Sequence, residues 1–137
     1  MGFDLKTLSI DPQGQKTTYE IIDPRTEEPL VDDKGNVATL TLWGPDSSVI
    51  KNVEKQFRKS AEEKAFKNRK KESMLNYALD LQRRKAVAAV CEWENIGWDG
   101  KELECTPANV KLVFDNLPWI EEQVKVFISD RVNFMKS

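Results

Sequence analysis

The spacing of apolar residues predicts strands in the first part of the chain. Residues 16–23 alternate weakly and are rich in β-branched and aromatic side chains, which is typical of a strand. Residues 37–43 repeat the pattern, with Leu40 and Leu42 on one face. A turn cluster at 32–36 separates the two runs, so we predict an antiparallel hairpin. Because a two-stranded hairpin is marginal in water, it must lie against a helix or another chain's sheet.

A helical period replaces the alternation after residue 44. Asp46 or Ser47 can cap a helix, and apolar residues then recur three or four positions apart. We predict a long helical region from about 47 to about 92, with Asn68 as the candidate position for a break. Its apolar stripe consists of Ile50, Val53, Phe57, Ala61, Met74, Leu75, Ala78, Leu79, Leu81, Val87, Ala88 and Val90.

Residues 93–134 hold three of the four tryptophans and the clearest turn signals. Asp99-Gly100 favours a tight reversal, because both residues tolerate positive φ. Thr106-Pro107 is a helix start, and Pro118 ends that helix and opens another. One helical stripe is Val110, Val113, Phe114 and Leu117; the other is Ile120, Val124, Phe127, Ile128 and Val132. Such stripes usually face a core.

These patterns predict one α+β domain over residues 1–137. Residues 1–45 form a β-rich front, 46–92 the long helical region, and 93–137 a Trp-rich helical pair. Near the start, Leu5, Leu8 and Ile10 could cover a neighbouring surface.

Composition narrows the possible functions. The 137 residues contain no histidine, so the commonest general base and metal ligand are missing. Glycines are isolated in turns and form no phosphate loop. We therefore expect a non-enzymatic protein without cofactor or bound metal. Cys91 and Cys105 are expected to be reduced, half-buried thiols. Without a long apolar run or a secretory signal, the chain is expected to be soluble and intracellular.

Two binding functions remain open. A basic segment, Arg58 to Lys71, could lie along a nucleic-acid backbone. The net charge of −2 and the scarcity of aromatic residues there favour a solvated helix face or a surface for another protein. Aromatic residues are frequent interface anchors, although a core position is the commoner fate of each. The candidate partner-binding residues are Trp43, Trp93, Trp98, Trp119, Phe57 and Phe127.

Several motifs resemble those of one viral family. These are the Asp-Pro and acidic stretch of 21–30, the Gly-x-Asp-Ser helix start of 44–47 and the Trp-x-x-Ile of 93–96. The set also includes the Asp-Gly turn of 99–100, the Thr-Pro-x-Asn of 106–109, the Leu-Pro-Trp-Ile-x-x-Gln-Val segment of 117–124 and the closing residues 127–134. Together they resemble the tail assembly chaperones of long-tailed, siphovirus-like bacteriophages.

The resemblance implies a chaperone that binds the tail tape measure protein, keeps it soluble and helps recruit major tail tube subunits. It implies work in the host cytoplasm, absence from the mature virion, and self-association or a frameshifted longer form. It carries no catalytic residues. The alternatives are a tail structural, head-tail connector or tail-completion protein, and less so a nucleic-acid-binding helical protein.

Overall fold

The computed structural model describes residues 2–9, 15–65 and 72–135, and the side chains of these residues except 61–65 and 72–75. A three-stranded antiparallel sheet has the order β1 (Lys16–Glu20), β4 (Thr39–Trp43) and β5 (Val90–Glu94). Leu42 of β4 lies opposite Thr17 on one side and Val90 on the other. The α+β class and the antiparallel hairpin are therefore confirmed.

Strand β5 corrects the prediction that the helical region extends to residue 92. Val90 is β-branched, and its pairing beside Leu42 buries it, so tertiary contacts outweigh the helical pattern of the residues before it. The hairpin therefore gains a third strand from within its own chain. The predicted strand at 16–23 is also divided: after β1, a short β2 (Ile22–Asp23) pairs with β3 (Glu28–Pro29).

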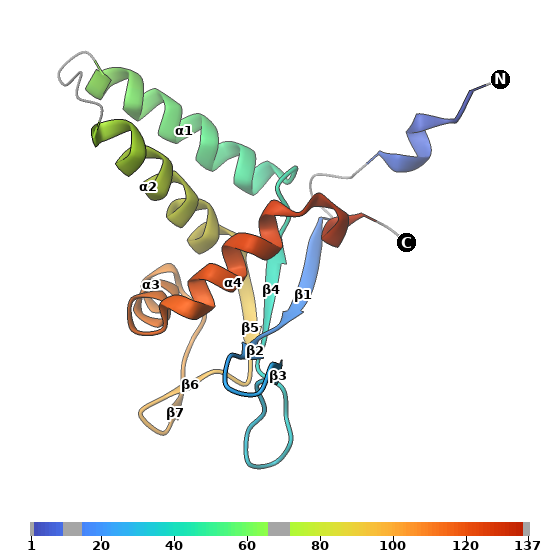
Figure 1. The fold of residues 1–137 in the computed structure, drawn as a ribbon, viewed down its shortest axis with the longest axis vertical. Coiled ribbons are helices and arrows are strands. Elements are labelled where there is room, and N and C mark those ends of the chain that lie inside the picture. Colours follow the sequence, from blue (N-terminus) through green and yellow to red (C-terminus); the bar gives the residue numbers. More distant parts are fainter. Residues whose placement is uncertain (1, 10–14, 66–71, 136–137) are drawn as a thin grey trace.

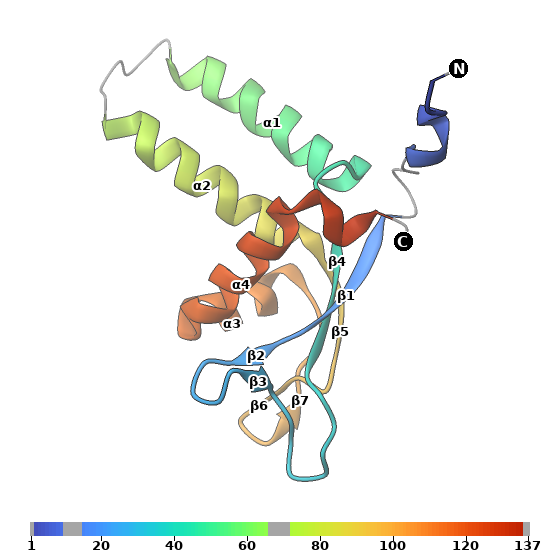
Figure 2. The ribbon, with the colours of Figure 1, turned by 45° about the vertical axis from the view of Figure 1, so that its right-hand side comes forward.

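The long helical region is a helical hairpin of α1 (Ser48–Ala65) and α2 (Glu72–Ala89), which lie side by side and project from the sheet (Figures 1 and 2). Asn68 lies outside the described residues. Ser47 caps α1, since its hydroxyl accepts the amide of Ile50 at 3.3 Å, whereas Asp46 pairs with Arg131. Ala78 and Leu79 do not join the predicted apolar stripe, because both are exposed, Leu79 to 51%. Ala61, Met74 and Leu75 of that stripe lie outside the described side chains.

In residues 93–135 the turn and both helix starts lie where the sequence predicts them. Asp99 (φ 51°) and Gly100 (φ 77°) form the reversal between β6 (Gly97–Trp98) and β7 (Lys101–Glu102). Thr106 caps α3 (Pro107–Asn116) by accepting the amide of Asn109. Helix α4 (Pro118–Ser129) then begins at its proline. Short 3₁₀ helices lie near the two ends: η1 (Leu5–Leu8) and η2 (Arg131–Phe134).

The helical spacing predicts Val132 in the apolar stripe of α4, and that prediction is wrong. The helix ends at Ser129, so Val132 falls in η2, where its side chain is exposed. Asp130 begins η2, because its side chain accepts the amide of Val132. Val132 therefore lies in a separate helix, and the residue spacing of α4 does not apply to it.

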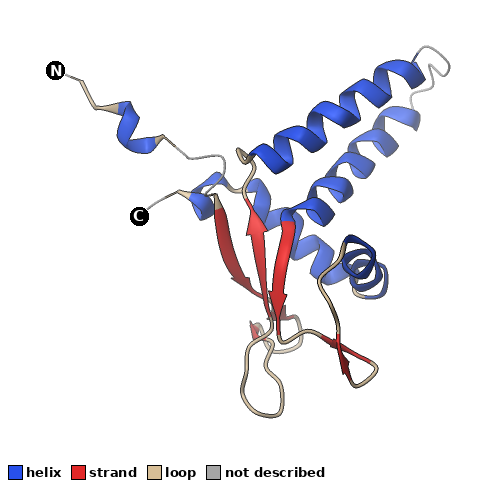
Figure 3. Ribbon diagram, turned by 180° about the vertical axis from the view of Figure 1, so that it is seen from behind, coloured by secondary structure: helices blue, strands red, loops and turns tan. Residues whose placement is uncertain are grey.

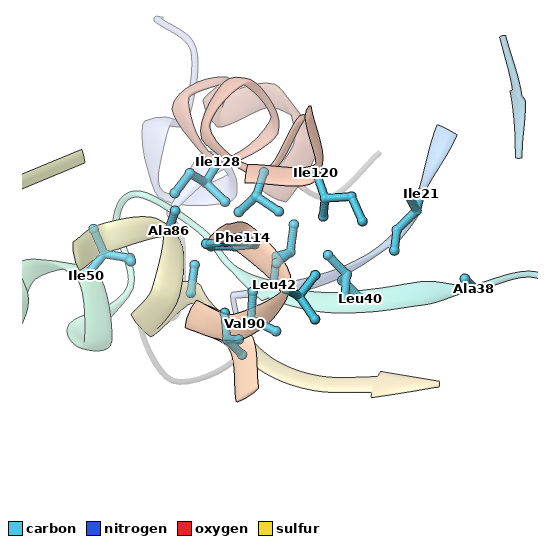
Figure 4. Packing of buried hydrophobic residues seen from close by; sticks show 14 of the residues in the cluster. Ile21, Ala38, Leu40, Leu42, Ile50, Ala86, Val90, Phe114, Ile120 and Ile128 are labelled. Atoms are coloured by element: carbon cyan, nitrogen blue, oxygen red, sulfur yellow. The ribbon is translucent and has the colours of Figure 1, made fainter. Parts of the chain in front are cut away.

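One core joins residues from the front, the helical hairpin and the tail (Figure 4). Helix α4 crosses one face of the sheet, and seen from behind (Figure 3) no helix of the described chain lies over the other face. The labelled core side chains in Figure 4 are Ile21, Ala38, Leu40, Leu42, Ile50, Ala86, Val90, Phe114, Ile120 and Ile128.

Candidate partner-binding surface

The six aromatic residues proposed from the sequence do not gather at one place. They are distributed over α1, β4, β5, β6 and α4. Phe57 is 7% exposed and belongs to the helical hairpin, where its ring contacts Tyr77 at a centroid distance of 4.5 Å and lies beneath the Arg84 guanidinium. Its position is that of a packing residue between α1 and α2.

Trp119 and Phe127 lie on α4 and pack against the core while remaining half-buried. Phe127 contacts Tyr19 and Phe134, with ring centroids 4.7 Å and 5.4 Å away. Edge and tilted contacts of this kind fix ring orientation. The Phe127 ring therefore joins α4 to β1 and η2.

Trp43 and Trp98 are half-buried, as Trp93 and Trp119 are. Trp43 follows buried Leu42 along β4, is half-buried and packs against the core cluster. The Lys16 ammonium lies 4.6 Å from its ring centroid, a cation–π distance. Trp98 is half-buried in the β6–β7 hairpin and does not belong to the core cluster.

Trp93 borders a shallow groove of about 510 Å³ beside β5. Its indole N–H donates to the Leu103 carbonyl at 2.7 Å, which holds the 102–105 segment alongside the strand. The lining is completed by Leu103, three carboxylates and two thiols; the latter five residues are Glu92, Glu102, Glu104, Cys91 and Cys105. The groove thus combines an aromatic wall with negative charge, a combination that suits an apolar segment carrying Lys or Arg. Of the six proposed residues, only Trp93 lines it.

Cys91 and Cys105 are free and half-buried, as expected from the sequence. Burial raises the pKa of both thiols, and for Cys105 the neighbouring Cys91 and Glu92 raise it further. The raised pKa keeps them protonated at neutral pH, which lowers their nucleophilicity. Within the described residues, no three His, Cys, Asp or Glu side chains come together in a way that could hold a metal ion.

The basic residues of α2 are engaged by acidic side chains. Arg83 lies 2.6 Å from Asp115 and 3.7 Å from Glu121, and Lys85 lies 2.9 Å from Glu54. Arg84 pairs with Asp80 one turn earlier at 3.3 Å. This pairing leaves these cations less available to phosphate groups than their sequence suggests. Most of the other basic segment, residues 58–71, lies outside the described side chains.

Sequence reasoning missed two features of the surface. The acidic groove is not evident from the sequence, because its glutamates come from β5, from β7 and from the segment after β7, and the helical pattern extends the predicted helix over the first residues of β5, to about residue 92. The alternating Glu92-Trp93-Glu94 could have signalled a strand. The exposure of Leu79 was also missed, since helical spacing does not reveal which face of a hairpin is covered. No described helix combines the length and apolarity that a membrane crossing requires.

A scan against protein-family models, a search of curated proteins and a search of solved structures each gave no match.

Proposed function

We propose that this protein is a tail assembly chaperone of a long-tailed bacteriophage. It binds the tape measure protein, keeps it soluble in the host cytoplasm and helps to recruit tail tube subunits, and it makes or breaks no covalent bond. The motif resemblance supports this proposal along most of the chain. The structural observation that carries it is the groove beside β5, because its aromatic wall and three glutamates suit a partner that is both apolar and basic.

The mechanism is the shielding of apolar surface. A tape measure protein is a long helical rod whose apolar side chains need cover until the tube has assembled around it. The Trp93 ring supplies apolar contact, while Glu92, Glu102 and Glu104 pair with cations that flank the apolar residues of the partner. Each contact is weak, so release remains easy, and many copies along one rod act together through multivalency.

Leu79 offers a second contact of the same kind. It is an exposed apolar residue of α2, a helix that projects from the sheet with α1 (Figure 1). A long partner helix that occupies the groove can also contact Leu79, whereas a short peptide in the groove cannot. Leu79→Asp should therefore weaken the binding of a rod-like partner and leave the binding of a short peptide unchanged.

Co-expression with the tape measure protein of the same phage tests the proposal. We expect the wild-type chain to raise the soluble fraction of that protein and to co-purify with it. Reversing the groove charge with Glu92→Lys and Glu102→Lys should abolish both effects. Glu94→Lys is the matched control, since Glu94 is an exposed glutamate on the same strand outside the groove lining. A head-tail connector would instead form a closed ring by itself and leave the tape measure protein insoluble.

A further inference from the structure

Helix α1 presents a cationic face to solvent. In residues 51–60, every exposed side chain is either a cation or a carboxamide. The cations are Lys51, Lys55, Arg58 and Lys59, and the carboxamides are Asn52 and Gln56. Residues four apart lie on one side of a helix, so the three lysines form a row about 12 Å long. We call these four cations and two carboxamides the α1 face.

Carboxylates of the described residues do not neutralise the α1 face. Glu54 is the one carboxylate in residues 51–60, and it is half-buried and pairs with Lys85 of α2 at 2.9 Å. Among the described side chains, no Asp or Glu forms a salt bridge with a cation of the α1 face. The basic residues of α2, in contrast, all pair with carboxylates. Within the described part of the helical hairpin, the unpaired positive charge therefore lies on α1.

The α1 face is accessible to a large partner. Helices α1 and α2 project together from the sheet (Figures 1 and 2), and α1 packs on α2 through Phe57, which is buried and contacts Tyr77. The β6–β7 hairpin, which carries Glu102 of the groove, lies at the opposite end of the sheet (Figure 1). A polyanion on α1 is therefore separated from this glutamate, and salt screens the remaining repulsion from a chain whose net charge is −2.

The composition of the α1 face favours a phosphate backbone over other anionic partners. Protein interfaces are more than half apolar in area, and a helix that binds a membrane surface buries an apolar face. None of the six side chains of the α1 face is apolar, and the apolar residues Ile50 and Phe57 of this helix are buried in the fold. Arg, Lys, Asn and Gln are all common phosphate ligands. No aromatic side chain is exposed on the α1 face to stack on an unpaired base, which favours a duplex over a single strand.

We propose that the α1 face binds the phosphate backbone of a nucleic-acid duplex without sequence specificity. Each cation pairs with a phosphate and displaces a condensed counterion, so the affinity depends steeply on salt. For four such contacts, the logarithm of the binding constant falls with the logarithm of the salt concentration with a slope of about −3.6. The proposal is independent of the chaperone function, because it uses neither the groove nor Leu79.

Fluorescence anisotropy of a short labelled DNA duplex of mixed sequence, titrated with the purified full chain, tests the proposal. We expect the affinity to fall about 100-fold between about 50 and 200 mM salt. Lys51→Gln with Lys55→Gln should halve the slope, to about −1.8, and weaken binding at least tenfold at the lower salt concentration. Lys51→Arg with Lys55→Arg, which keeps both charges, should retain the wild-type slope.

Lys101→Gln with Lys111→Gln is the matched control. Both lysines are exposed and lie outside α1, so this variant loses the same charge and should bind like wild type. Because all four replaced lysines are exposed, both glutamine variants should keep the thermal stability of wild type, which distinguishes lost binding from lost folding.

Three results would overturn the proposal. The first is a duplex that does not bind at the lower salt concentration, and the second is an equal loss of affinity in the two glutamine variants. The third is binding of polyglutamate or of phosphatidylserine vesicles as tight as that of the duplex, which would assign the α1 face to an acidic protein or a membrane. No tape measure protein is present, so failure here is separate from failure of the proposed function.

Discussion

Gln123 joins α4 to the edge of the sheet through three hydrogen bonds. Its side-chain oxygen accepts the Tyr19 hydroxyl at 2.8 Å and the Ile22 amide at 3.0 Å, and its nitrogen donates to the Ile22 carbonyl at 2.8 Å. Burial raises the pKa of Tyr19, so its hydroxyl remains a donor across the range of folding assays. Replacing this amide should therefore loosen the contact between the helix and the sheet more than the loss of a single hydrogen bond would.

The expected cost can be estimated bond by bond. A net hydrogen bond contributes about 1 kcal/mol, and a partner left unsatisfied in a partly buried site costs somewhat more. Gln123→Ala leaves three such partners, of which water can reach some, because the site is only half-buried. We expect a loss of about 2–3 kcal/mol in the free energy of unfolding. Tyr19→Phe, which removes one of the three bonds, should cost about 1 kcal/mol.

Urea unfolding followed by tryptophan fluorescence measures these changes, with an unchanged m-value as the sign that two-state behaviour persists. Gln82→Ala is the control, because Gln82 is an exposed glutamine in another helix and should lose less than about 0.5 kcal/mol. A double-mutant cycle of Tyr19→Phe with Gln123→Ala isolates their shared bond. If Gln123→Ala unfolds at the same urea concentration as Gln82→Ala, the proposed contact does not stabilise the fold.

Two further predictions concern the fold. Gly44→Ala should destabilise the protein by about 1–3 kcal/mol, because an added Cβ would lie 2.6 Å from the Phe134 ring and would clash with the Gln15 side chain. Thermal unfolding measures this loss. Gly2→Ala is the control, because nothing lies within 4 Å of a Cβ added at Gly2. Hydrogen bonds from the Arg25 side chain and amide lower the pKa of Asp23. The Asp23 carboxylate therefore contributes to the free energy of unfolding above its unfolded-state pKa of ~4, and this contribution is lost as the pH falls through its folded-state pKa. Asp23→Asn should therefore flatten the acid limb of stability against pH, and an unchanged limb would contradict this.

Local chemistry made parts of the fold predictable. The Asp99-Gly100 reversal and the Thr106-Pro107 helix start depend on backbone preferences of the residues themselves, and both are confirmed. The inward positions of Leu40 and Leu42 follow from strand alternation alone. Each of these features is determined within a few residues, so no knowledge of distant partners was needed.

The parts that sequence reasoning missed depend on contacts between distant segments. Strand β5 follows directly on α2, and its residues are extended because they pair with β4, some fifty residues earlier in the chain. The Cys91 thiol, for example, donates to the Thr41 carbonyl at 3.2 Å. The groove beside β5 depends on that strand, so its glutamates could not be grouped beforehand. Tryptophan identity indicated sites of dense packing but not which ring edge remains exposed. The assignment of the six aromatic residues to partner binding stays a prediction.

The proposed chaperone function is tested most directly by the soluble fraction of the tape measure protein when it is co-expressed with this chain. We expect wild type and Glu94→Lys to keep it soluble and bound, and the Glu92→Lys, Glu102→Lys variant to lose both effects. Equal solubility with and without the wild-type chain, in cells where the chain itself is folded and abundant, would contradict that function.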